Sequence, residues 1–94
     1  MAMYSWTITK DNIGLGTVGI TGPSDGPFEA NEIRASDERV KFRMLCDDGE
    51  VMCEGWFVGD SASEDGFGPL DDYGECALGA AHIQYKEKGK WVEL

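Results

Sequence analysis

The chain has 94 residues, with 18 Asp and Glu against 8 Lys and Arg, so its net charge is −10. This length suits one domain with a modest core, and we treat residues 1–94 as a single domain. A hydrophobic content of 41% excludes an intrinsically disordered chain. No apolar stretch approaches the roughly 20 residues that cross a bilayer, and no charged start with an apolar run indicates a signal peptide. We therefore expect a cytoplasmic protein.

Two strands are predicted before residue 22. Residues 3–10 alternate, with Tyr4, Trp6 and Ile8 on one face, as in a half-buried strand. Residues 13–21 predict a second strand with Val18 and Ile20 facing the core, although the glycines within it indicate a bulge.

The glycines of that segment also have the spacing of a dinucleotide-binding loop, at Gly14, Gly16 and Gly19. The next residues are Ile20-Thr21-Gly22-Pro23, which do not begin a helix, and the chain is too short for the βαβ unit that such a loop requires. We expect no cofactor at this position.

Residues 28–36 predict one short helix. Glu29 and Glu32 lie near its N-terminus and Arg34 near its C-terminus, an arrangement that the helix dipole favours. Phe28 and Ile33 are its expected core contacts.

A β-hairpin over residues 39–58 is the clearest element. Asp48-Gly49 lies between two alternating runs and predicts a two-residue type I′ turn. The resulting register pairs Val40 with Phe57, Lys41 with Trp56, Phe42 with Gly55, Arg43 with Glu54, Met44 with Cys53, Leu45 with Met52, Cys46 with Val51 and Asp47 with Glu50. The opposite charges of Arg43 and Glu54 support this register.

Residues 59–79 are the least regular segment, and a loop of about twenty residues is unusual in a compact domain and often functional. Within it, residues 69–76 predict a helical turn, and Phe67, Leu70 and Tyr73 are expected to pin the segment to the sheet.

A second hairpin is predicted over residues 81–94 with Lys88-Gly89 in its turn. Its register pairs Glu87 with Lys90, Lys86 with Trp91, Tyr85 with Val92, Gln84 with Glu93 and Ile83 with Leu94. The expected fold class is α+β, mainly β: an antiparallel sheet of about five or six hairpin-connected strands with one short helix, either open or closed into a small barrel.

The acidic residues are concentrated in one stretch of the chain. No Lys or Arg occurs between Arg43 and Lys86, and this interval contains ten carboxylates: Asp47, Asp48, Glu50, Glu54, Asp60, Glu64, Asp65, Asp71, Asp72 and Glu75. The other eight acids balance the eight bases, so the net charge belongs to this interval. Such asymmetry favours a positively charged partner and repels nucleic acid and anionic membranes.

We select seven of these carboxylates as partner-binding residues: Asp47, Asp48, Glu50, Glu64, Asp65, Asp71 and Asp72. Carboxylates held in a row on a rigid sheet imitate the phosphate backbone of nucleic acid. Such a row would compete for the Lys and Arg groove of a nucleic-acid-binding protein. The alternative interpretation is a solvated surface that keeps the protein soluble.

No pattern indicates a metal site or a reaction. Cys46, Cys53, Cys76 and His82 are four soft ligands, but their spacing matches no zinc finger, and we interpret the cysteines as reduced thiols. The loop 60–66 lacks the alternating Asp and Asn residues of a calcium site. The carboxylates are expected to be solvated, without an apolar pocket that raises a pKa for acid–base catalysis. We expect no enzyme, no metal and no cofactor.

The segments FRMLCDDGE, SEDGFGPLDDYGE and IQYKEKGKWVEL, together with the N-terminal YSWTIT, carry a resemblance. Over most of its length the chain resembles a group of small acidic hypothetical proteins carried by phages and other mobile elements. The resemblance implies such a genomic neighbourhood but no site residues. Small acidic phage proteins include anti-CRISPR and anti-restriction inhibitors that act as mimics of nucleic acid.

The leading hypothesis is therefore a non-enzymatic inhibitor that docks its acidic face on a basic nucleic-acid-binding protein, such as a CRISPR or restriction component. It would act in the host cytoplasm if phage-borne, and it would bind neither nucleic acid nor membranes directly. The alternative is a structural or assembly module of a phage or mobile element, as a homodimer. Its contact surface would be the outer face of the first hairpin, at Leu45, Met52, Trp56 and Val58.

Overall fold

The computed structural model describes residues 2–94 and contains a six-stranded antiparallel sheet of order β2-β1-β4-β3-β5-β6, which does not close into a barrel. The strands are β1 (Ser5–Asp11), β2 (Thr21–Gly22), β3 (Val40–Leu45), β4 (Val51–Val58), β5 (His82–Glu87) and β6 (Lys90–Glu93). The helical elements are α1 (Ala30–Ala35), the 3₁₀-helix η1 (Glu64–Phe67) and the π-helix η2 (Leu70–Leu78). The predicted α+β, mainly β class is confirmed.

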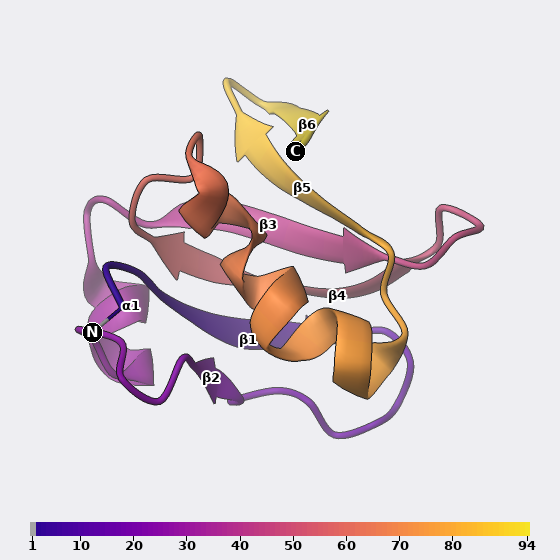
Figure 1. Cartoon of the computed structure of the whole chain (residues 1–94), viewed down its shortest axis with the longest axis horizontal. Helices are drawn as coiled ribbons and strands as arrows, with labels where there is room; N and C mark the ends of the chain where they lie inside the picture. The colour runs from indigo at the N-terminus through magenta and orange to yellow at the C-terminus, as the bar shows by residue number, and fades with distance from the viewer. Residues whose placement is uncertain (1) are drawn as a thin grey trace.

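The sheet is the middle of three layers (Figure 1). On one face, α1 packs against β1 and β4 with Ile33 fully buried, and the nearby Phe28 amide donates to Ser5 Oγ. The neighbour of Ser5 on β1 is Trp6, which points to the other face and contacts η2 through Asp72. Because alternate side chains of a strand point to opposite faces, α1 and the η1–η2 segment cover opposite sides of the sheet.

The hydrophobic core lies between the sheet and the η1–η2 segment. Its buried members are Trp6, Ile8, Phe42, Met44, Cys53, Phe57, Leu70, Leu78, Ala80, Ile83 and Tyr85. Two of the predicted anchors of the segment are confirmed, because Leu70 is buried and Tyr73 packs against the core, whereas Phe67 is 37% exposed. The helical turn predicted at 69–76 is also present, as the larger part of η2.

The first hairpin has the predicted register along most of its length. Five pairs are confirmed, from Val40 with Phe57 to Met44 with Cys53. At the turn the prediction is wrong, because Leu45 pairs with Val51 rather than with Met52. The Gly49 amide donates to Cys46 O and the Cys46 amide to Glu50 O, so residues 47–49 form a three-residue loop. Gly49 has φ +84°, and Asp48 lacks the positive φ that a type I′ turn requires.

The second hairpin is confirmed for four of the five predicted pairs; the fifth, Ile83 with Leu94, lies beyond the end of β6, although the Leu94 amide donates to Ile83 O at 3.2 Å. Gln84, Tyr85, Lys86 and Glu87 pair with Glu93, Val92, Trp91 and Lys90 as predicted. Lys88 and Gly89 both have positive φ, at 49° and 80°, which is the geometry of a type I′ turn.

The strand predicted at residues 13–21 is wrong, since only Thr21–Gly22 pairs as β2. The Asp11 carboxylate instead accepts hydrogen bonds from the amides of Ile13, Gly14 and Thr17, at 2.9, 3.1 and 3.1 Å. This acceptor lets the backbone turn where a strand would have continued, and it leaves Val18 54% exposed. Ile20 does pack against the core, as predicted.

The predicted helix at 28–36 is present as the shorter α1. Ile33 is buried as predicted, but Phe28 is 40% exposed and is not a core contact. The side chains of Glu29 and Glu32 form a reciprocal capping box, so these acids act as caps as well as favourable charges.

Replacement of Gly55 by Ala should be strongly destabilising. A Cβ at this position would overlap the carbonyl oxygen of Thr7 and lie 2.9 Å from the Phe42 ring. Since neither a sheet carbonyl nor a buried ring moves easily, we expect Gly55→Ala to cost about 3 kcal/mol of unfolding free energy in urea denaturation. Gly89→Ala is the control. A Cβ at Gly89 would meet no neighbouring atom, and only the φ of +80° disfavours alanine there, so we expect a loss of about 1–2 kcal/mol of unfolding free energy. Equal losses of unfolding free energy in the two variants would contradict the close contact of Gly55 with Thr7 and Phe42.

The Asp11 loop should loosen in acid. Hydrogen bonds from the amides of Thr17 and Ile13 lower the pKa of the Asp11 carboxyl below its usual 3.8. A carboxyl with a lowered pKa stabilises the fold above its unfolded-state pKa, and this contribution disappears as the pH falls through the folded-state pKa. Asp11→Asn should therefore weaken amide hydrogen-exchange protection at Ile13 and Thr17 near neutral pH, and it should flatten the acid limb of stability. The exposed Asp37→Asn is the control and should leave the exchange protection at Ile13 and Thr17 unchanged.

Candidate interaction surface

The segment from 59 to 80 forms an acidic layer over one face of the sheet. It carries six carboxylates and no Lys or Arg: Asp60, Glu64, Asp65, Asp71, Asp72 and Glu75. We call this segment the acidic layer. It has no strand pairing, and it is held by turns of 3₁₀- and π-helix that pack Leu70 and Leu78 onto the core.

The backbone of the acidic layer packs closely against side chains of the sheet. A Cβ at Gly68 would overlap the Tyr4 ring, and one at Gly74 would overlap Met44 Sδ. The buried Tyr85 hydroxyl donates to Gly66 O at 2.8 Å, which ties the start of the layer to β5. Glycine at these positions therefore allows an approach that a side chain would prevent.

Asp72 is the main polar anchor of the layer. Its Oδ2 accepts hydrogen bonds from Tyr4 Oη at 2.8 Å and from Trp6 Nε1 at 3.1 Å. Burial, followed by the hydrogen bond to Asp72, raises the pKa of the Tyr4 hydroxyl well above its usual value. The charges of Asp65 and Asp71 also raise the pKa of this hydroxyl.

The seven predicted site residues fall into two groups. Glu64 and Asp65 lie in η1, and Asp71 and Asp72 lie in the first turn of η2; we call these four residues the acidic cluster. Asp47, Asp48 and Glu50 lie in and beside the β3–β4 turn, which extends from the far end of the sheet (Figure 1). They are exposed there, at a distance from η1. The seven carboxylates therefore do not form one short row.

Glu75 was not selected from the sequence, yet it is exposed on η2. A π-helix has i→i+5 hydrogen bonds, so a residue four positions after Asp71 lies about one turn further along the helix. Glu75 thus extends the charge of the cluster along η2. The sequence of this segment is rich in glycine and has no helical periodicity, so it did not indicate that Glu75 would lie one turn from Asp71.

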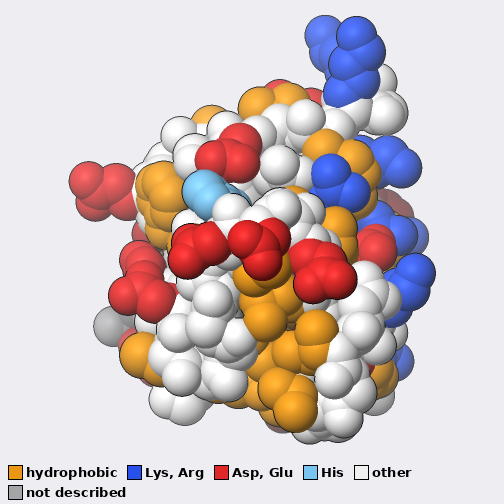
Figure 2. Space-filling view, turned by 90° about the vertical axis from the view of Figure 1, so that its right-hand side faces the viewer, with side chains coloured by type: hydrophobic (Ala, Val, Ile, Leu, Met, Phe, Trp, Pro, Cys, Tyr) orange, Lys and Arg blue, Asp and Glu red, His pale blue; other side chains and the backbone are white. Residues whose placement is uncertain are grey.

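The basic residues lie on the other side of the molecule. Lys41, Arg43 and Lys86 alternate with the core residues of β3 and β5, so they point away from the acidic layer. Figure 2 shows this segregation: most carboxylates occupy the middle and left of the view, and Lys and Arg lie along the right edge and at the top, with one carboxylate among them. The linear charge asymmetry of the sequence is therefore also an asymmetry between faces.

The structure does not expose the apolar patch proposed for a homodimer. Leu45 and Val58 are each only 5% exposed, and Met52 packs against the core. Trp56 is partly buried, and the cations of Arg39 and Lys41 lie over its ring, 4.7 and 5.7 Å from the centroid.

The structure also shows the surroundings of the candidate metal ligands and of the cysteines. Among residues 2–94 there is no pocket, and no group of three or more His, Cys, Asp or Glu side chains is arranged to hold a metal ion. The three cysteines are free thiols, and burial raises the pKa of the Cys53 thiol to about 11. No helix in this part of the chain is long and apolar enough to span a membrane.

No family model, curated protein or solved structure matches this chain.

The hydrogen bonds to Asp72 predict that this residue contributes to stability and its neighbour Asp71 does not. Asp72→Ala removes the acceptor of Trp6 Nε1, on a residue only 2% exposed, and should cost about 1–3 kcal/mol of unfolding free energy. Asp72→Asn retains a carbonyl acceptor and should recover most of this loss. Asp71→Ala should stay within about 0.5 kcal/mol of the wild type. Urea denaturation followed by tryptophan fluorescence measures all three, and equal effects at Asp71 and Asp72 would contradict the assignment.

Proposed function

We propose that the protein is a non-enzymatic inhibitor that binds a basic nucleic-acid-binding protein through its acidic layer. One observation carries this proposal: the layer contains six carboxylates and no base, and the basic side chains of β3 and β5 point to the opposite face. A partner whose groove is lined by Lys and Arg, such as a CRISPR effector or a restriction enzyme, has the complementary charge. The resemblance to small acidic phage proteins supports the same class of partner and action in the host cytoplasm.

The proposed contact residues differ in how freely they can reach a partner. Asp72 is engaged by Tyr4 and Trp6, so its charge contributes to the field while its position is fixed. Glu64, Asp71 and Glu75 are exposed on the layer and can approach a partner directly. Asp47, Asp48 and Glu50 form a second acidic group at the end of the sheet, and only a partner that extends beyond the layer would reach them.

The test is inhibition of DNA binding by a purified CRISPR effector nuclease and by a purified restriction endonuclease, measured with labelled DNA. The wild-type protein should inhibit at least one of them, and inhibition should weaken as salt rises. The double variant Glu64→Lys, Asp71→Lys should weaken inhibition by about tenfold or more, because each reversal turns an attraction into a repulsion.

Glu93→Lys is the matched control, since Glu93 lies on β6 beside His82 and Gln84 and outside the acidic layer. It should inhibit as the wild type does. Absence of inhibition of both enzymes, or inhibition that is insensitive to both salt and the double variant, would refute the proposed mimicry.

A further inference from the structure

The outer face of the sheet, opposite the acidic layer, presents two tryptophans covered by cations. Arg39 lies 4.7 Å and Lys41 5.7 Å from the Trp56 ring centroid. Arg43 lies 4.2 Å and Lys86 5.8 Å from that of Trp91. We call these six residues the basic–aromatic face. It extends across β4, β3, β5 and β6, beyond the area where α1 contacts β1 and β4.

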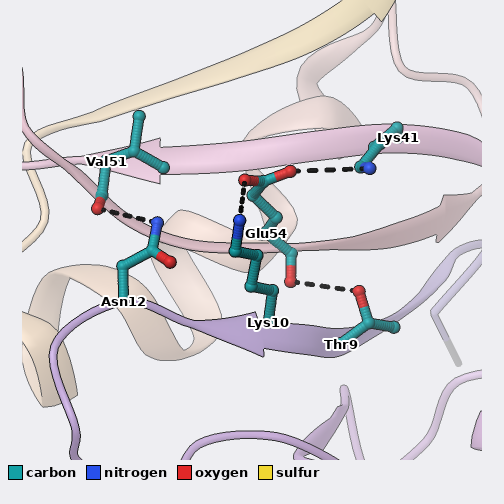
Figure 3. A network of polar contacts seen from close by, with 6 residues as sticks. All are labelled: Thr9, Lys10, Asn12, Lys41, Val51 and Glu54. Carbon is teal, nitrogen blue, oxygen red and sulfur yellow. Dashed lines mark hydrogen bonds and ion pairs between the residues drawn. The ribbon is translucent and has the colours of Figure 1, made fainter.

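The charge of this face is only partly neutralised within the molecule. The carboxylate of Glu54 on β4 forms ion pairs with Lys10 Nζ at 3.8 Å and with Lys41 Nζ at 3.5 Å (Figure 3). Arg43, which faces Glu54 across the strands, donates instead to Gln84 Oε1 at 2.8 Å. Within residues 2–94, Arg39, Arg43 and Lys86 have no carboxylate partner within ion-pair distance. Glu93, opposite Gln84 on β6, also lies on this face, where it contacts His82 and Gln84. Arg39, Arg43 and Lys86 are thus the cations available to an anionic ligand.

The aromatic groups narrow the class of ligand. Trp56 and Trp91 lie on strands that are three strand spacings apart, roughly 14 Å across the sheet. Indole rings and Arg guanidinium planes are the groups on which unpaired bases stack, and nearby Lys and Arg side chains bind the phosphates. Because residues 2–94 enclose no pocket, an extended strand lying across the face fits better than a small molecule in a cavity.

The net charge of −10 predicts repulsion of nucleic acid for the protein as a whole, but the charges are separated in space. The molecule is 21 Å thick along its shortest axis, the direction of view in Figure 1, and the acidic layer lies on the near side of the sheet. The Debye length at physiological salt is about 8 Å, so the carboxylates of the layer are largely screened at the opposite face.

We propose that the basic–aromatic face binds single-stranded nucleic acid: bases displace the cations from the rings of Trp56 and Trp91 and stack there, and the displaced Arg39, Arg43 and Lys86 bind the phosphates. This site is independent of the acidic layer and of the function proposed for it. An acidic protein segment would use the same cations without needing the indoles, and the experiment distinguishes the two occupants.

The experiment titrates the full chain with a fluorescently labelled 20-nucleotide oligothymidylate, using anisotropy for binding and tryptophan emission for stacking. Binding should quench the partly exposed Trp56 and Trp91, whereas Trp6 is buried and should not respond. With three phosphate contacts, log K should fall with log salt with a slope of about −2. Trp91→Leu should weaken binding by about tenfold, and Trp91→Phe should restore part of the loss.

Phe67→Leu is the matched control, because Phe67 is an exposed aromatic residue in the acidic layer, and it should bind as the wild type does. The double variant Glu64→Lys, Asp71→Lys should retain binding, so failure of the proposed inhibitor function would not affect this result. Near-UV circular dichroism confirms that each variant is folded.

Three outcomes would overturn the proposal. The first is the absence of binding and quenching at low salt. The second is equal affinity for duplex and single-stranded DNA, which would indicate phosphate contacts without stacking. The third is equal or tighter binding of a polyglutamate peptide that is unaffected by Trp91→Leu, which would assign the face to an acidic protein.

Discussion

The structure depends on the burial of one face of the sheet beneath the segment 59–80. Trp6, Phe42 and Phe57 lie on that face and would be exposed to water without this cover. The cover has few apolar side chains of its own. It reaches the sheet because glycines permit close backbone approach and because the carboxylate of Asp72 accepts hydrogen bonds from Tyr4 Oη and Trp6 Nε1. Charge is thus brought to this face by the same segment that closes the core.

The hairpins were predictable because strand alternation and turn chemistry are local properties. The period of two in residues 40–45 and 51–58 fixes the pairing except at the turn, where Gly49 alone adopts positive φ and shifts Leu45 onto Val51. In the second hairpin, Lys88 and Gly89 both adopt the positive φ that a type I′ turn requires. The strand predicted at 13–21 failed for a local reason as well: three backbone amides bind the Asp11 carboxylate instead of a neighbouring strand.

The candidate surface was only partly predictable, because its shape depends on contacts between distant residues. The sequence shows that the acids are contiguous in the chain, but the position of Asp72 depends on Tyr4 and Trp6, more than sixty residues away. The π-helix that aligns Asp71 with Glu75 has no sequence period that signals it. The separation of Asp47 and Asp48 from the acidic cluster follows from the length of the hairpin, which carries its turn beyond the end of the sheet.

The two charged faces and the core have a common origin in the strand register. On β3, the alternation that buries Phe42 and Met44 also places Lys41 and Arg43 on the outer face. A slip of one residue would bury both cations and expose both core side chains, a change that the hydrophobic core strongly opposes. The segregation of charge therefore needs no separate stabilising interaction. Any substitution that preserves the core register preserves the basic–aromatic face, and the charge of the acidic layer can vary without loss of that face.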